Sequence, residues 1–160
     1  MGGLSKVFVV ILPFQKTELM RIVKAFWKPI VWAFVVLGLS AMSGENVEKL
    51  PLINVPNIDK VAHFIMYFVF TFLMMYDFTR FKGKVFSRMQ IIVFSLLVTI
   101  LYGGGMELLQ SIPRLHRSTD IKDFLANSSG AICAVLLYKP IAKVFDRILS
   151  FILPQRYCSL

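Results

Sequence analysis

The chain has 160 residues, of which 57% are hydrophobic and 17% are charged, and it carries a net charge of +9. An ordinary soluble domain has roughly 25% charged residues, and a soluble chain of this length buries only about 70% of its unfolded surface. The composition excludes an ordinary soluble globular domain, a disordered chain and a disulfide-stabilised scaffold, and it predicts a small integral membrane protein.

Four charge-free stretches predict four transmembrane helices. They cover residues 29–44, 61–76, 89–106 and 124–138. Each is slightly shorter than the roughly 20 residues that cross about 30 Å of hydrocarbon, so flanking residues must extend each helix. The predicted fold class is all-α: a polytopic membrane protein whose four transmembrane helices form one compact bundle.

The distribution of lysine and arginine predicts the orientation of these helices. Of the 18 such residues, 13 lie before the first predicted helix, between the second and third, or after the fourth. Cytoplasmic segments carry the excess of positive charge, so both termini are expected in the cytoplasm. No nucleic-acid partner is expected, because the sequence has no basic groove or nucleic-acid-binding motif.

The chain divides into three expected regions. Residues 1–24 form a cytoplasmic or interfacial segment, residues 25–138 the transmembrane domain, and residues 139–160 an amphipathic cytoplasmic tail. Met20 offers an alternative start site. A second alternative is that the first apolar stretch is a signal peptide cleaved near residues 41–43. Cleavage would leave three helices and place the basic C-terminus outside, so the four-helix topology is preferred.

Polar residues of the second, third and fourth predicted helices gather at their outer ends. On the second and fourth helices they recur three or four positions apart, which places them on one face of each helix. Ionisable groups at this depth cost free energy unless they are paired, so a shared polar site is predicted. Its members are Asp59, His63, Tyr67, Glu107, Gln110, Arg117, Asp120, Asp123 and Asn127.

Several of these residues also have purely structural interpretations. Asp59 and Asp123 suit the positive N-termini of helices, and a lone His63 is more often a packing residue. Glu107 has no helix N-terminus nearby, which favours a functional role. Three glycines at residues 103–105 precede it and indicate either a bend or a close approach of another helix.

These residues resemble the VanZ-like family of bacterial membrane proteins. The resemblance covers roughly residues 27–138 and implies a multi-pass protein of the bacterial cytoplasmic (inner) membrane, associated with low-level teicoplanin resistance. It is carried by Asp59-Lys60 with His63 and Tyr67, by Gly105-Met106-Glu107-Leu108-Leu109-Gln110, and by Arg117-Ser118-Thr119-Asp120 with Asp123, Asn127 and Gly130.

Two classes of function follow, and the residues leave both open. In the first, the protein binds or masks a component of the cell envelope: an envelope lipid, a lipid-linked precursor or the lipoglycopeptide itself. The ligand-binding residues are then Asp59, Tyr67, Gln110, Arg117, Asp120 and Asn127.

In the second class, the protein is an interfacial enzyme that modifies an envelope lipid or a lipid-linked headgroup. His63 acts as general base and is oriented by Asp59. Glu107 or Asp123 is a second acid or base, and Arg117 holds a phosphate. A divalent ion held by His63 and nearby carboxylates is an alternative, but the spacing matches no recognised metal motif. The expectation is therefore no metal and no cofactor.

Overall fold

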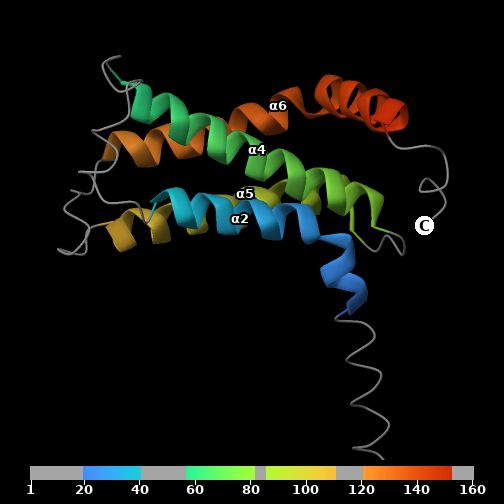
Figure 1. Cartoon of the computed structure of the whole chain (residues 1–160), viewed down its shortest axis with the longest axis horizontal. Coiled ribbons are helices and arrows are strands. Elements are labelled where there is room, and N and C mark those ends of the chain that lie inside the picture. The colour runs from blue at the N-terminus through green and yellow to red at the C-terminus, as the bar shows by residue number, and fades with distance from the viewer. Residues whose placement is uncertain (1–19, 41–56, 82–85, 111–120, 153–160) are drawn as a thin grey trace, which may run out of the picture.

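The computed structural model describes residues 20–40, 57–81, 86–110 and 121–152. These residues form helices and no strand, which confirms the all-α prediction. The long helices are α2 (Trp27–Ser40), α4 (Ile58–Arg80), α5 (Arg88–Gln110) and α6 (Ile121–Ile152), and a short helical stretch at residues 20–25 precedes α2 (Figure 1).

Neighbouring helices in the sequence run in opposite directions. In Figure 1, α4 and α6 run from left to right, and α2 and α5 return from right to left. Helix α4 packs against each of the other three helices, most extensively against α6. The starts of α4 and α6 therefore lie at the same end of the bundle as the ends of α2 and α5, and the polar residues predicted to meet lie on these segments.

The contact between α4 and α6 depends on small side chains. Ala131 and Ala134 of α6 are fully buried, and Gly130 faces the backbone of Phe64 in α4. A Cβ atom at position 130 would collide with the carbonyl oxygen of Phe64 and lie 3.0 Å from its carbonyl carbon, so one of the two backbones would have to shift. Small residues allow two helix backbones to approach this closely.

Helix α6 extends well beyond the fourth charge-free stretch. It continues past Tyr138 and through Pro140 to Ile152, so the amphipathic stretch after residue 139 belongs to the same helix. Proline lacks the backbone N–H of a helical hydrogen bond and bends helices that contain it. In Figure 1 the ribbon of α6 changes direction where orange passes into red.

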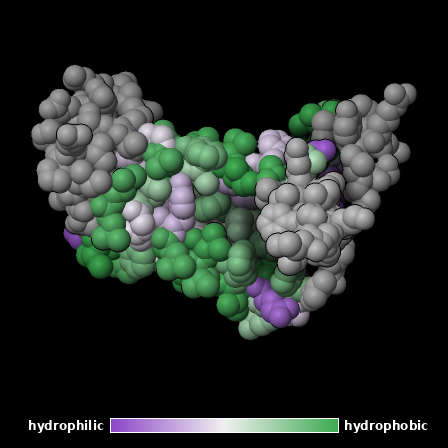
Figure 2. All heavy atoms as spheres, turned by 90° about the horizontal axis from the view of Figure 1, so that it is seen from below, coloured by the Kyte–Doolittle hydropathy of each residue, from purple (hydrophilic) through white to green (hydrophobic). Residues whose placement is uncertain are grey.

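The outer surface of the bundle is apolar. Large hydrophobic side chains are exposed on every long helix, including Phe34 of α2 and Leu136 of α6, which are 68% and 74% exposed. Figure 2 shows green hydrophobic residues across the middle of the molecule. Among the described helices, α4 and α5 are long and apolar enough to cross a membrane, and α2 is a shorter apolar helix.

At the end opposite the predicted site, a second set of charged side chains joins three helices. Lys28 of α2 forms an ion pair with Asp77 of α4, whose side chain is almost completely buried. Asp146 of α6 accepts a hydrogen bond from the Tyr76 hydroxyl at 2.6 Å and pairs with Arg80. We call these five residues the tether cluster, because they join α2 and α6 to the last two turns of α4.

Candidate functional site

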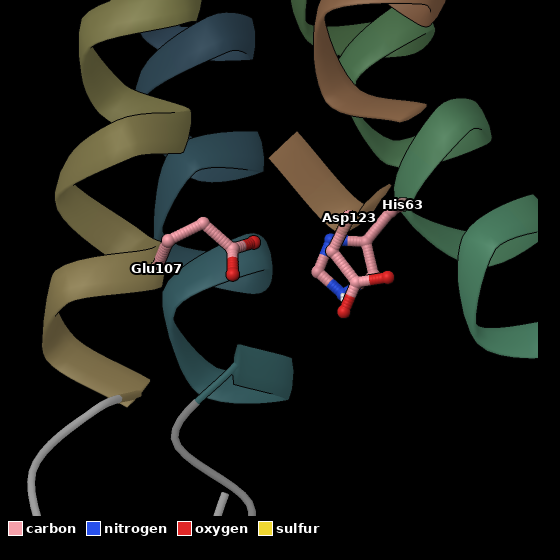
Figure 3. A group of neighbouring side chains, drawn as sticks. All are labelled: His63, Glu107 and Asp123. Atoms are coloured by element: carbon pink, nitrogen blue, oxygen red, sulfur yellow. Dashed lines mark ion pairs between the residues drawn. The ribbon is translucent and has the colours of Figure 1, made fainter. Parts of the chain in front are cut away.

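Four of the residues expected in the polar site lie together at the end of the bundle where α4 and α6 begin and α5 ends. His63 of α4, Glu107 of α5 and Asp123 of α6 are 4%, 4% and 7% exposed, and Asn127 of α6 is 1% exposed. Figure 3 shows the Glu107 carboxylate pointing across from α5 toward the His63 ring and the Asp123 carboxylate. These four residues are the buried polar site.

Asn127 connects the histidine to the glutamate. Its amide nitrogen donates a hydrogen bond to Glu107 Oε1 at 3.4 Å, and its amide oxygen lies 3.0 Å from His63 Nδ1. An amide oxygen can only accept hydrogen bonds, so His63 Nδ1 carries the proton and donates it. In the neutral imidazole this leaves a free lone pair on Nε2.

Asp123 lies on the other side of the histidine ring. Its Oδ2 atom is 3.9 Å from His63 Nε2, which is longer than the 2.7–2.9 Å of a charge-assisted hydrogen bond. Its Oδ1 atom is 3.3 Å from Lys60 Nζ, and Lys60 also pairs with Asp59 at 2.7 Å. The Lys60 ammonium group therefore pairs with two carboxylates, those of Asp59 and Asp123, at the edge of the site.

Tyr67 lies one helical turn beyond His63, with its ring against Gly103. A Cβ atom at position 103 would lie 3.0 Å from Tyr67 Cε1 and 3.4 Å from Asn127 Nδ2. Helix α5 is continuous through the three glycines, so Gly103 makes room for Tyr67 and Asn127. The Tyr67 hydroxyl is buried and has no hydrogen-bond partner within the described part of the chain.

An open apolar groove between α5 and α6 reaches this site from the side of the bundle. Its volume is about 700 Å³. Glu107 is the one ionisable residue among the described residues that line it. The remaining lining residues are Ile100, Leu101, Gly104, Gly105, Leu108, Ile121 and Phe124. The buried carboxylate of Glu107 is thus next to a surface that suits hydrocarbon.

The structure brings five of the nine predicted site residues together: His63, Tyr67, Glu107, Asp123 and Asn127.

The other four predicted residues have different positions. Asp59 pairs with Lys60 at the edge of the site, and its side chain is 44% exposed. Gln110 is the last residue of α5, and its side chain lies outside the described part of the structure. Arg117 and Asp120 also lie outside the described residues.

The prediction did not include Lys60, although one signal was available. Lys60 precedes His63 by three positions, a spacing that places both residues on one helix face.

The arrangement can act chemically in two ways. Carboxylate oxygens and the His63 Nε2 lone pair together form a set of acceptors that can hold a cation or bind hydrogen-bond donors. The same lone pair, on a ring oriented by Asn127, can accept a proton from a bound molecule.

A protein-family model described as VanZ/LLP1 matches residues 5–145. This stretch contains all nine predicted site residues and extends beyond residues 27–138 on both sides. No curated protein and no solved structure matches the chain. The match confirms the resemblance noted in the sequence. Together with the apolar helices α4 and α5, it identifies the chain as a membrane protein that belongs to the VanZ/LLP1 family.

Proposed function

We propose that this protein is a multi-pass protein of the bacterial cytoplasmic membrane that binds or masks a lipid-anchored component of the cell envelope. One observation carries the proposal: a buried polar site built from three helices lies beside an open apolar groove. Low-level teicoplanin resistance is then one consequence of that binding.

The two surfaces suit the two parts of a lipid-anchored molecule. The groove between α5 and α6 is lined mostly by apolar side chains and has room for a hydrocarbon chain. Glu107 stands where the groove meets the buried polar site, next to Asn127 and His63. A molecule with its chain in the groove therefore has its polar headgroup at these side chains.

The proposed orientation places this site at the outer leaflet. The lysine and arginine distribution puts both termini in the cytoplasm, and four membrane crossings then direct the starts of α4 and α6 outward. Teicoplanin carries a fatty acyl chain, so a protein that binds at the outer interface is positioned to interfere with its membrane anchoring.

The test compares teicoplanin susceptibility in cells that express matched variants. His63→Ala and Glu107→Gln should each abolish the resistance that the wild-type protein confers, with the protein still present in membranes. Asp146→Asn is the control, because it removes a carboxylate of the tether cluster at the opposite end of the bundle. Full resistance in both site variants would contradict the proposal.

A mass-spectrometric comparison identifies the ligand class. The wild-type protein, purified in mild detergent, should retain an envelope lipid or lipid-linked molecule that Glu107→Gln loses. Equal lipid profiles for the two proteins would count against a lipid-anchored ligand at this site.

A second candidate function is an interfacial enzyme that modifies an envelope lipid or lipid-linked headgroup. The observation that favours it is the hydrogen bond from His63 Nδ1 to Asn127, which orients a lone pair on Nε2 for general-base catalysis. Vesicles with reconstituted protein and envelope lipids distinguish the two functions. A chemically altered lipid that His63→Gln fails to produce indicates the enzyme, and retention without alteration indicates the binding protein.

A further inference from the structure

We infer that His63, Glu107 and Asp123 form a binding site for one divalent first-row transition-metal ion, of which Zn²⁺ and Mn²⁺ are the representatives to test. Each residue offers one ligand atom, and these atoms all lie within 4.8 Å of one another. All three side chains are buried. Because they come from three helices, no linear metal-binding motif marks the site in the sequence.

The hydrogen bonds of the site leave the correct histidine nitrogen available. The Asn127 amide oxygen accepts a hydrogen bond from His63 Nδ1–H, so the Nε2 lone pair faces Asp123 Oδ2 across 3.9 Å. Two acceptors that face each other repel unless a proton or a cation lies between them. Ligand atoms about 2.1 Å from a tetrahedral ion are about 3.4 Å apart, so a small side-chain rotation closes this gap around an ion.

Asn127 also orients two of the ligands, as hydrogen-bond partners of metal-ligating side chains do in proteins. It holds the ring of His63 through Nδ1 and the carboxylate of Glu107 through Oε1. A partner on the far nitrogen of a ligating histidine fixes its tautomer and its orientation, and hydrogen bonds to ligating carboxylates do the same. Two of the three ligands are thus pre-oriented by a single buried amide.

The charges and the buried hydroxyl are consistent with a bound cation. Buried carboxylates cost free energy unless a positive charge accompanies them, and the ammonium of Lys60 is shared between Asp123 and Asp59. The Tyr67 hydroxyl is buried without a hydrogen-bond partner among the described residues. A buried hydroxyl without a protein partner is available to bond a water molecule or a ligand group.

Three protein ligands leave at least one coordination position open. Open positions are typical of metal sites in which the ion contacts a bound molecule, whereas structural zinc sites use four protein ligands. The inference does not depend on the proposed function, because the ion can be bound whichever envelope component the protein recognises.

The first experiment measures metal binding by the full chain in detergent micelles. Metal content is determined by mass spectrometry, and chelator-stripped protein is then titrated with Zn²⁺ and Mn²⁺. We expect one ion per chain in the wild type, and binding at least tenfold weaker in Glu107→Gln and Asp123→Asn. The matched control Asp146→Asn should bind as the wild type does. Absence of a stoichiometric ion, or equal binding by all four proteins, would overturn the inference.

A second variant tests direct coordination and guards against loss of folding. His63→Cys replaces one ligand with another that binds Co²⁺ and Zn²⁺. Loaded with Co²⁺, this variant should show the near-ultraviolet thiolate-to-cobalt absorption band. The wild type, which contains Cys133 and Cys158, should not show the band. Far-ultraviolet circular dichroism confirms that the variant is helical. A folded, Co²⁺-treated variant without the band would count against residue 63 as a ligand.

Discussion

Phe64 and Gly130 bring the backbones of α4 and α6 into direct contact. The carbonyl group of Phe64 occupies the space that a Cβ atom at position 130 would need. Phe64 follows His63 in the sequence, and Gly130 lies about one helical turn after Asn127. The contact therefore sets the separation of the two helices at the level where His63 donates its hydrogen bond to Asn127.

Gly130→Ala should destabilise the protein and weaken the buried polar site. The added methyl group collides with backbone, which cannot rotate away, and overpacking of this kind costs about 1–3 kcal/mol. The measurement is thermal unfolding in detergent. Gly105→Ala is the matched control, because a Cβ atom there has no neighbour within 4 Å. It should be neutral or slightly stabilising, since alanine favours a helix more than glycine does. Equal stability of the two variants would contradict the contact.

His63 and Glu107 should be energetically coupled through Asn127. In a double-mutant cycle of unfolding free energies, measured on chelator-stripped protein so that no metal ion links the two residues, the effects of His63→Ala and Glu107→Gln should differ from additivity by about 0.5–3 kcal/mol. Asn127→Leu removes the bridging amide, so repeating the cycle in that background should bring the coupling close to zero. A coupling that persists without the amide would show that the two residues interact by another route.

Breaking the Lys28–Asp77 ion pair should destabilise the protein more than replacing both residues with apolar side chains. Lys28→Met leaves the almost completely buried Asp77 carboxylate without this partner. Because the Lys28 side chain is 26% exposed, the loss should fall below the roughly 3–5 kcal/mol that breaking a fully buried pair costs. The double variant Lys28→Met/Asp77→Leu replaces the pair with apolar side chains and should recover most of the loss. Thermal unfolding of the single and double variants measures the difference. A double variant that is less stable than Lys28→Met would contradict the prediction.

Reporter fusions should show the membrane orientation that the lysine and arginine distribution predicts. A reporter inserted at Lys49 should report the outer side, and one joined after Leu160 should report the cytoplasm. The reason is the concentration of 13 of the 18 lysine and arginine residues in the segments assigned to the cytoplasm. Reporters on the same side would exclude the four-crossing topology, and with it an outward-facing polar site.

The positions of the helices follow from the sequence more closely than their ends do. The second charge-free stretch lies inside α4, but the helix also includes Asp59, Lys60 and Asp77. A helix predicted from a charge-free stretch ends at these residues. The structure continues through them because Asp59 pairs with Lys60 and Asp77 pairs with Lys28 of another helix. Lys28 and Asp77 are 49 positions apart in the chain, so helical periodicity does not predict their ion pair.

Helical periodicity and alternating direction were enough to predict that His63, Glu107, Asp123 and Asn127 meet. They could not predict which atoms bond. Asp59 was expected to orient His63, whereas Asn127 makes the hydrogen bond to its ring. That choice depends on how closely α4 approaches α6, which Gly130 determines through a contact with a backbone.

The length of α6 has a mechanical consequence. At 1.5 Å per residue its 32 residues extend about 48 Å, against about 30 Å of hydrocarbon. Asn127 and Asp146 are about 28 Å apart along this axis, so one helix connects the buried polar site with the tether cluster. Pro140 lies between these two residues, so a displacement of the C-terminal part of α6 either bends the helix at Pro140 or moves the Asn127 amide that contacts His63 and Glu107.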